Sequence, residues 1–93
     1  MSYRVYLDAN FHLMDTSART MSGEYASYAQ AEAAARELID GVLESEYHKS
    51  MRAEELMHAY MTRGEEPFII PDDEHAPFNG REYATARCQA LCR

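Results

Sequence analysis

Residues 27–48 read SYAQAEAAARELIDGVLESEYH, and their apolar side chains recur at the spacing of one long amphipathic helix. Ser27 followed by Gln30 predicts a capping box at the start of this helix. Gly41 costs about 1 kcal/mol relative to alanine inside a helix, so we expect another part of the chain to pack closely beside it. The predicted apolar stripe consists of Ala31, Ala35, Leu38, Ile39, Val42 and Leu43.

Two strands are predicted before this helix. Apolar and polar residues alternate from Tyr3 to Asp8, which is typical of a half-buried strand. Thr20 to Tyr25 predicts a second strand, in which Gly23 indicates a bulge or a close backbone approach. We expect the two strands to form an antiparallel hairpin that depends on the long helix, since a two-stranded hairpin is not stable alone.

The second half of the chain predicts two more helices and one extended segment. Residues 51–63 form the first of these helices, with Ser50 as its cap and Gly64 as its stop. The segment 68–70 lies between prolines and predicts a buried extended segment or a short third strand at the sheet edge. Asn79 caps a final helix that runs to about Cys92.

Strands followed by a run of helices predict one α+β domain over residues 1–93, with an antiparallel hairpin packed against three helices. We expect Leu38→Ala to cost about 2–5 kcal/mol of stability. The expected single core consists of Val5, Leu7, Leu38, Ile39, Val42, Leu56 and Tyr60.

Charge and composition exclude several classes of function. The 93 residues carry a formal net charge of −7, whereas binding a nucleic-acid backbone requires a basic patch. No apolar run approaches the roughly 20 residues of a membrane span. The N-terminus lacks the apolar core of a secretory signal, so we expect a cytoplasmic protein whose two cysteines, Cys88 and Cys92, are reduced thiols.

A cluster of polar side chains at the end of the first strand is the main candidate for a binding site. It consists of Asp8, Asn10, His12 and Asp15. A histidine flanked by carboxylates can act as a general base or bind a metal or a small molecule. The alternative is structural: Asp8 and Asn10 shape a turn, and His12 donates to a backbone carbonyl.

Two further groups resemble metal ligands but lack the required pattern. The run from Asp72 to His75 has neither the alternate spacing nor the glycine of a calcium loop, and we expect a solvated loop there. Glu54 and His58 lie one helical turn apart, but a catalytic zinc needs a third ligand. We also find no glycine-rich phosphate loop and no catalytic triad pattern, so we expect no metal, no cofactor and no catalytic residues.

Methionine and tyrosine side chains on the second predicted helix form an adaptable apolar surface. Met57, Tyr60 and Met61 could belong to the core, or they could form an interface for another protein. A third possibility for the acidic chain is that its carboxylates imitate a nucleic acid and occupy a basic protein.

Two strings carry a resemblance to other proteins: Tyr-Arg-Val-Tyr-Leu-Asp-x-Asn-Phe-His-x-Met-Asp over residues 3–15, and Gly-Glu-x-Pro-Phe-Ile at 64–69. Through them the chain resembles a family of small uncharacterised bacterial proteins, and the Asn-Phe-His-x-Met-Asp part is the most specific. Shorter matches are found at 23–25, 53–56 and 83–88. The chain departs from the family at Ala9, where members carry aspartate, and at Arg81, where they carry tryptophan. The resemblance implies a bacterial, cytoplasmic, single-domain protein and implies no activity.

These observations predict a non-enzymatic module that binds another protein or a second copy of itself. The alternative is a domain that binds a small molecule or a metal near His12.

Overall fold

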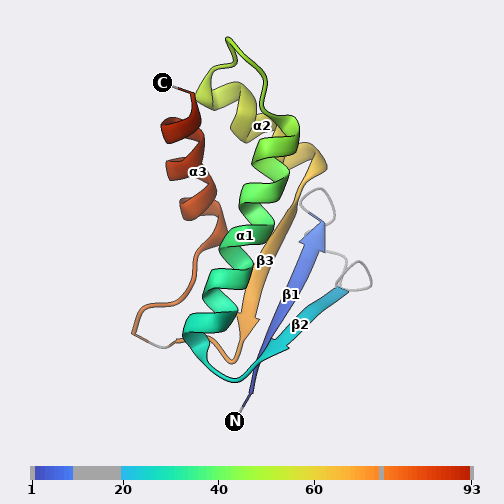
Figure 1. Cartoon of the computed structure of the whole chain (residues 1–93), viewed down its shortest axis with the longest axis vertical. Coiled ribbons are helices and arrows are strands. Elements are labelled where there is room, and N and C mark those ends of the chain that lie inside the picture. Colours follow the sequence, from blue (N-terminus) through green and yellow to red (C-terminus); the bar gives the residue numbers. More distant parts are fainter. Residues whose placement is uncertain (1, 10–19, 74, 93) are drawn as a thin grey trace.

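The computed structural model describes residues 2–9, 20–73 and 75–92. The chain has an α+β fold with a three-stranded antiparallel sheet and three helices (Figure 1). The elements follow one another as β1 Tyr3–Ala9, β2 Thr20–Tyr25, α1 Tyr28–Glu46, α2 Ala53–Arg63, β3 Glu65–Ile70 and α3 Gly80–Leu91. The predicted fold class is confirmed.

The sheet has the order β2-β1-β3, so the first strand lies in the centre. The predicted hairpin is confirmed, with Tyr3 opposite Tyr25. The extended segment near 68–70 is indeed a third strand and is longer than predicted, since β3 pairs with β1 from Arg4↔Ile70 to Ala9↔Glu65. Pro67 is tolerated because β3 is an edge strand, where one side of the backbone needs no partner.

A bulge lies beside Gly23, as the sequence predicts. Val5 is opposite Gly23 and Tyr6 is opposite Met21, so one extra residue is accommodated in β2. A Cβ atom on Gly23 would lie 2.8 Å from the hydroxyl oxygen of Tyr25. Glycine therefore leaves room for the Tyr25 side chain to fold back along its own strand.

Helix α1 packs across one face of the sheet, and α3 runs beside it (Figure 1). The side chain of Ser27 accepts a hydrogen bond from the backbone N–H of Gln30 at 3.2 Å, which confirms the predicted cap. The fully buried residues of α1 are Ala31, Ala35, Ile39 and Leu43. Leu38 and Val42 lie on the flanks of this stripe and are only partly buried.

Gly41 does not have the close neighbour that we expected. A Cβ atom built there would meet nothing within 4 Å, apart from the backbone of its own helix. The residue lies on the exposed side of α1, where it lines an open hollow together with Arg63 of α2.

Helix α2 begins two residues later than predicted, and its cap is not Ser50. Ser50 has φ 76°, a left-handed turn conformation that precedes the helix. Arg52 is the N-cap instead, with its backbone N–H donating to Oε1 of Glu55 at 3.2 Å. Gly64 ends the helix as predicted, and it must be small because a Cβ atom would lie 2.6 Å from the carbonyl oxygen of Tyr60.

Helix α3 begins as predicted, with the Asn79 side chain accepting from the backbone N–H of Glu82 at 3.0 Å. A polar clamp fastens it to α1. Asp40 of α1 accepts from the hydroxyl of Tyr83 at 3.0 Å and from Nε of Arg87 at 3.1 Å. This clamp fixes the position of α3 beside α1, and hence the space between α3 and α2.

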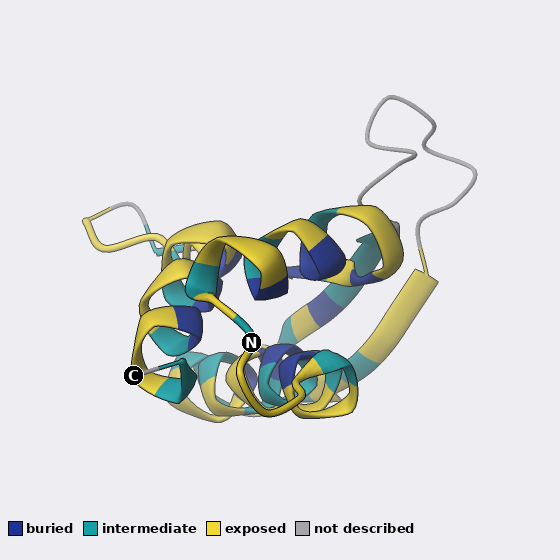
Figure 2. Cartoon of the chain, turned by 90° about the horizontal axis from the view of Figure 1, so that it is seen from above, coloured by how far each residue is buried: buried dark blue, intermediate teal, exposed yellow. Residues whose placement is uncertain are grey.

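The buried side chains form two clusters rather than the single core that we expected. Ile39, Leu43, Leu56, Tyr60, Ala84 and Cys88 form the helical cluster, to which the three helices contribute. Val5, Ala31, Ala35 and Ile69 form the sheet cluster between α1 and the sheet. Phe78 packs against both (Figure 2 shows the buried positions facing the interior). Leu7 is only half-buried.

Candidate functional site

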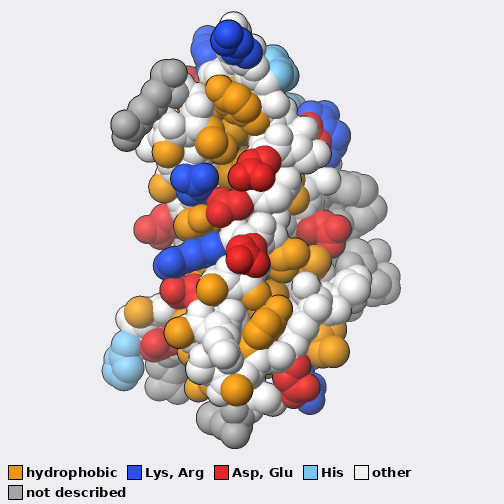
Figure 3. Space-filling view, in the orientation of Figure 1, with side chains coloured by type: hydrophobic (Ala, Val, Ile, Leu, Met, Phe, Trp, Pro, Cys, Tyr) orange, Lys and Arg blue, Asp and Glu red, His pale blue; other side chains and the backbone are white. Residues whose placement is uncertain are grey.

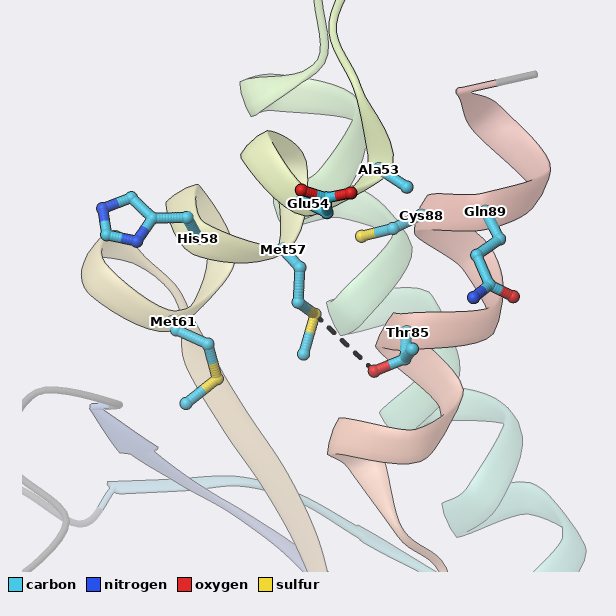
Figure 4. Close-up of a pocket in the computed structure, with 8 residues that line it drawn as sticks. All are labelled: Ala53, Glu54, Met57, His58, Met61, Thr85, Cys88 and Gln89. Carbon is cyan, nitrogen blue, oxygen red and sulfur yellow. Dashed lines mark hydrogen bonds between the residues drawn. The ribbon is translucent and has the colours of Figure 1, made fainter.

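An open groove between α2 and α3 is a mainly apolar hollow (Figure 4). Its volume is about 420 Å³. We call it the α2–α3 groove; its lining residues are Ala53, Glu54, Met57, His58, Met61, Thr85, Cys88 and Gln89.

Helical spacing places the two methionines in this groove. Met57 and Met61 lie one turn apart on α2, and Met57 extends towards α3 (Figure 4). The hydroxyl of Thr85 lies 3.8 Å from the sulfur of Met57 and 2.9 Å from the carbonyl oxygen of Arg81. A hydroxyl has one proton, and the short contact with the carbonyl makes better use of it, so the sulfur of Met57 is only weakly held.

The inner wall of the groove contains a thiol of low reactivity. Cys88 is buried among the residues of the helical cluster. Burial raises the pKa of its thiol, and the nearby Cys92 raises it further. Because the thiolate is the reactive form, Cys88 is a packing residue rather than a nucleophile.

The polar side chains of the groove lie around its margin. In Figure 4 the ring of His58 points away from α3, while Gln89 projects from the α3 side. Within the described ranges, no group of three or more histidine, cysteine, aspartate or glutamate side chains is arranged to hold a metal ion. Glu54 and His58 thus have no third ligand within the described ranges, and the margin supplies polarity rather than a metal centre.

The interface predicted on α2 needs one correction. Met57 and Met61 are partly exposed and line the groove. Tyr60 is fully buried, and its hydroxyl donates to the carbonyl oxygen of Glu65 at 3.3 Å. Tyr60 therefore belongs to the core, because its position on α2 turns it towards the helical cluster.

The groove has a second wall that the sequence analysis missed. Thr85, Cys88 and Gln89 all come from α3, and their role depends on how α3 packs against α2. The available signal was the apolar side of α3, which contains Ala84 and Cys88, but nothing in that pattern names the helix that it faces.

The predicted cluster near His12 falls largely outside the described residues. Asp8 lies in β1, half-buried and opposite Glu66 of β3. Asn10, His12 and Asp15 are not among the described residues. A binding site centred on His12 therefore stays a prediction.

The acidic segment after β3 uses its carboxylates to hold its own backbone. Asp72 accepts from the hydroxyl of Tyr28 at 2.6 Å and from the backbone N–H of Phe78 at 3.2 Å. Asp73 accepts from the backbone N–H groups of His75 and Ala76. These bonds are those of turn-forming aspartates and do not form a metal loop.

The hydrogen bond between Tyr28 and Asp72 also changes the pKa of the tyrosine. Burial, together with the hydrogen bond to the Asp72 carboxylate, raises the pKa of Tyr28 to about 12. The group lies at the junction of α1 and the acidic segment, where a neutral phenol donates one hydrogen bond and accepts another. We assign it a structural role.

A second surface lies on the face of the sheet opposite Val5 and Ile69. The rings of Tyr6 and Phe68 stack there, with centroids 5.6 Å apart. Met21 and Ile70 are 53% and 46% exposed. Tyr6 and Phe68 are both half-buried, so the stack is partly open to solvent.

No helix within the described residues is both long and apolar enough to cross a membrane. Comparison with protein-family models, with curated proteins and with solved structures finds no match.

Proposed function

We propose that this chain is a non-enzymatic module that binds another protein by taking an amphipathic helix into the α2–α3 groove. The observation that carries this proposal is the groove itself, an open hollow of about 420 Å³ whose walls are mainly apolar. Helix-in-groove recognition uses apolar anchors that repeat every three or four residues and enter such a hollow.

The side chains of the groove suit a partner whose shape is not closely prescribed. Met57 and Met61 are unbranched and polarizable, so they can adjust to different anchors. Thr85 and Gln89 place polar groups beside the apolar wall, which is the usual arrangement of an apolar centre and a polar rim.

A non-enzymatic role is supported by where the perturbed groups lie. Perturbed pKa values often mark active sites. Here Tyr28 is tied to Asp72, and Tyr83, whose pKa is raised by burial and by the Asp40 carboxylate, belongs to the clamp between α1 and α3. In the groove, the raised pKa of Cys88 makes the thiol less reactive.

We infer in addition that the protein works in the bacterial cytoplasm and does not bind nucleic acid. The resemblance to a bacterial family and the two free cysteines support the first statement. The net charge of −7 supports the second, because it repels a phosphate backbone. A charge of the same sign also opposes self-association, so we favour a different protein over a second copy.

The test is a selection of 14-residue helical peptides from a displayed library, followed by methionine-methyl NMR. We expect selected peptides to shift the methyl resonances of Met57 and Met61 and to leave Met21 unchanged. Met57→Glu should abolish binding, because a carboxylate in the groove would have to be desolvated by the apolar anchor. Met21→Glu is the matched control, since Met21 lies on the sheet, is 53% exposed and does not line the groove.

Two results would contradict the proposal: no peptide enriched over the display scaffold, or enriched peptides that bind the Met57→Glu variant as tightly as the unchanged chain. Light scattering on the unchanged chain identifies the remaining alternative. A dimer at micromolar concentration that Met57→Glu dissociates would mean that a second copy occupies the groove.

A further inference from the structure

The α2–α3 groove continues along α3 into a second, polar hollow. Thr85 lines both. The second hollow has a volume of about 500 Å³ and is lined also by Glu66, Asn79, Arg81 and Glu82. A helix that lies in the groove therefore passes over this hollow at one end, and we call that end the Glu66 end.

The Glu66 end carries a carboxylate whose hydrogen bonding is incomplete. Oε1 of Glu66 is shielded from solvent and has no hydrogen-bond donor among the described residues. The nearest cation is Nε of Arg81 at 3.4 Å, longer than a good charged hydrogen bond of about 2.7–2.9 Å. The Glu66 side chain as a whole is 27% exposed, so it lies at the surface of the hollow rather than in the core.

The charges around this hollow favour a cation from a partner. Glu66 and Glu82 supply two carboxylates, and Arg81 supplies one guanidinium that is 46% exposed. A second cation would face an excess of negative charge here, within a molecule whose net charge is −7. At the opposite end of the groove, Gln89 and Ala53 are uncharged, and the carboxylate of Glu54 is exposed, where a charge pair is worth little.

We propose that the partner helix is basic at one end, and that its lysine or arginine binds Glu66 while its apolar anchors fill the space beside Met57 and Cys88. This inference rests on the proposed function and adds the direction in which the helix lies. Cys88 and Arg81 are two turns apart on α3, a distance of about 10 Å. The basic residue of the partner therefore lies about two turns from the apolar anchor that meets Cys88.

The sequences of the peptides selected above give the first readout. We expect lysine or arginine to be enriched about seven positions from the main apolar anchor, on the same side of the helix. Replacing that residue with glutamine in a selected peptide should weaken binding about tenfold or more, the range found when one member of a charged hydrogen-bonded pair is removed.

Substitutions in the chain give the second readout. Glu66→Gln keeps the shape of the side chain but removes its charge. It should weaken the binding of the basic peptide by a similar factor. Glu37→Gln removes the same charge from an exposed position on α1 outside the groove, and should change binding by less than about twofold. Arg81→Gln should strengthen binding, because it removes the cation that competes for Glu66.

The outcomes separate this inference from the proposed function. Two results would show that the direction of the helix is wrong while the groove remains the binding site. In the first, peptides shift the methyl resonances of Met57 and Met61 but carry basic residues at no fixed distance from the apolar anchor. In the second, Glu66→Gln and Glu37→Gln change the affinity for the peptide equally. If no peptide reaches the groove, the proposed function itself fails. Thermal unfolding of Glu66→Gln checks that the variant is folded, and the Arg81→Gln result tests the direction without altering Glu66.

Discussion

Two glycines, one inside a helix and one at a helix end, have opposite structural roles. Gly41 lies inside α1, and apart from its chain neighbours and the backbone of its own helix no atom of the described residues lies within 4 Å of the place where a Cβ atom would be. Gly64 ends α2, and a Cβ atom there would lie 2.6 Å from the carbonyl oxygen of Tyr60. The sequence indicates the stop at Gly64, but the space around each glycine depends on what the fold places beside it.

We predict that Gly41→Ala stabilises the protein by about 1 kcal/mol, since alanine has the higher helix propensity and meets no obstacle. Gly64→Ala should destabilise it, because the added methyl group would collide with the backbone of α2. Urea unfolding of both variants measures the two effects. A lower midpoint for Gly41→Ala would show that α1 has a neighbour at this position after all.

Tyr28 makes stability depend on pH in the alkaline range. Its folded pKa of about 12 lies above the ordinary value of 10, so the folded state favours the neutral phenol. The contribution of this group is complete below pH 10 and is lost as the pH rises towards 12. The free energy of unfolding should therefore fall over this interval.

Tyr28→Phe should remove that part of the pH dependence and cost about 1 kcal/mol at neutral pH through lost hydrogen bonds. Urea unfolding as a function of pH measures the change in the free energy of unfolding. Ultraviolet titration of the variant should show one fewer tyrosine that ionises above the ordinary pKa. Tyr47→Phe is the control, because Tyr47 is 39% exposed. Parallel pH profiles for Tyr28→Phe and the unchanged chain would contradict the assignment.

At the scale of the element, the sequence predicted the helix of residues 27–48 more accurately than its rotation. The buried stripe of α1 repeats every four residues through Ala31, Ala35, Ile39 and Leu43. Leu38, which we expected in the core, is only partly buried and lies on the flank of the sheet cluster. The apolar pattern does not determine which of Leu38 and Ile39 is fully buried, because the two residues are adjacent and equally apolar.

The two positions should therefore differ in their effect on stability. We predict that Ile39→Ala costs about 2–5 kcal/mol, because Ile39 is fully buried and its loss leaves a cavity. Leu38→Ala should cost less, about 1–2 kcal/mol, since part of the side chain is already in water. Glu37→Ala is the exposed control and should cost under about 0.5 kcal/mol. Chemical denaturation ranks the three variants, and a larger loss at position 38 than at 39 would mean that α1 is rotated.

The capping residues show the same limit at the ends of the elements. Ser27 and Asn79 cap α1 and α3 as predicted, because each is followed by residues that begin a helix at once. Ser50 does not cap α2, because its left-handed backbone places it in the turn before Arg52. Residue type marks a candidate cap, and the backbone of the connection selects the one that is used.

At the scale of the molecule, Phe78 connects the helical cluster and the sheet cluster. It packs against both, and its backbone N–H donates to Tyr28 and to Asp72. We predict that Phe78→Ala costs about 2–4 kcal/mol, because both clusters lose a neighbour.

Phe68→Ala is the comparison for this prediction. Phe68 is also half-buried, but it stacks on Tyr6 on the opposite face of the sheet, where neither cluster lies. In urea unfolding, Phe68→Ala should lower the free energy of unfolding by less than Phe78→Ala does. Equal losses would mean that the two clusters are stable without the connection.

The distribution of charge over the molecule bears on its partners rather than on its fold. In Figure 3, acidic side chains lie close to basic ones over the helices, and hydrophobic atoms appear between them. Most of the arginines in the described residues form ion pairs, and the exposed ones, such as Arg4 with Glu24 and Arg52 with Glu55, are of low energetic value. The acidic excess thus remains available to act on an approaching partner.

Features with a local cause could be predicted from the sequence: the alternation of β1, the helical period of α1, the caps at Ser27 and Asn79, the bulge at Gly23 and the α+β class. Each depends on residues within a few positions of one another. That Met57 and Met61 share one side of α2 could also be predicted, because they are one turn apart, while an interface on that side stays a prediction. The other wall of the groove depends on Thr85 and Cys88, 28 and 31 positions after Met57, and no local pattern relates them to α2.

Three other contacts depend on the tertiary structure in the same way: the hydrogen bond between Tyr28 and Asp72, the position of Tyr60 in the core and the pairing of Glu66 with Arg81. The periodicity of a helix shows which of its sides is buried, but packing across the whole chain determines the neighbour against which that side lies.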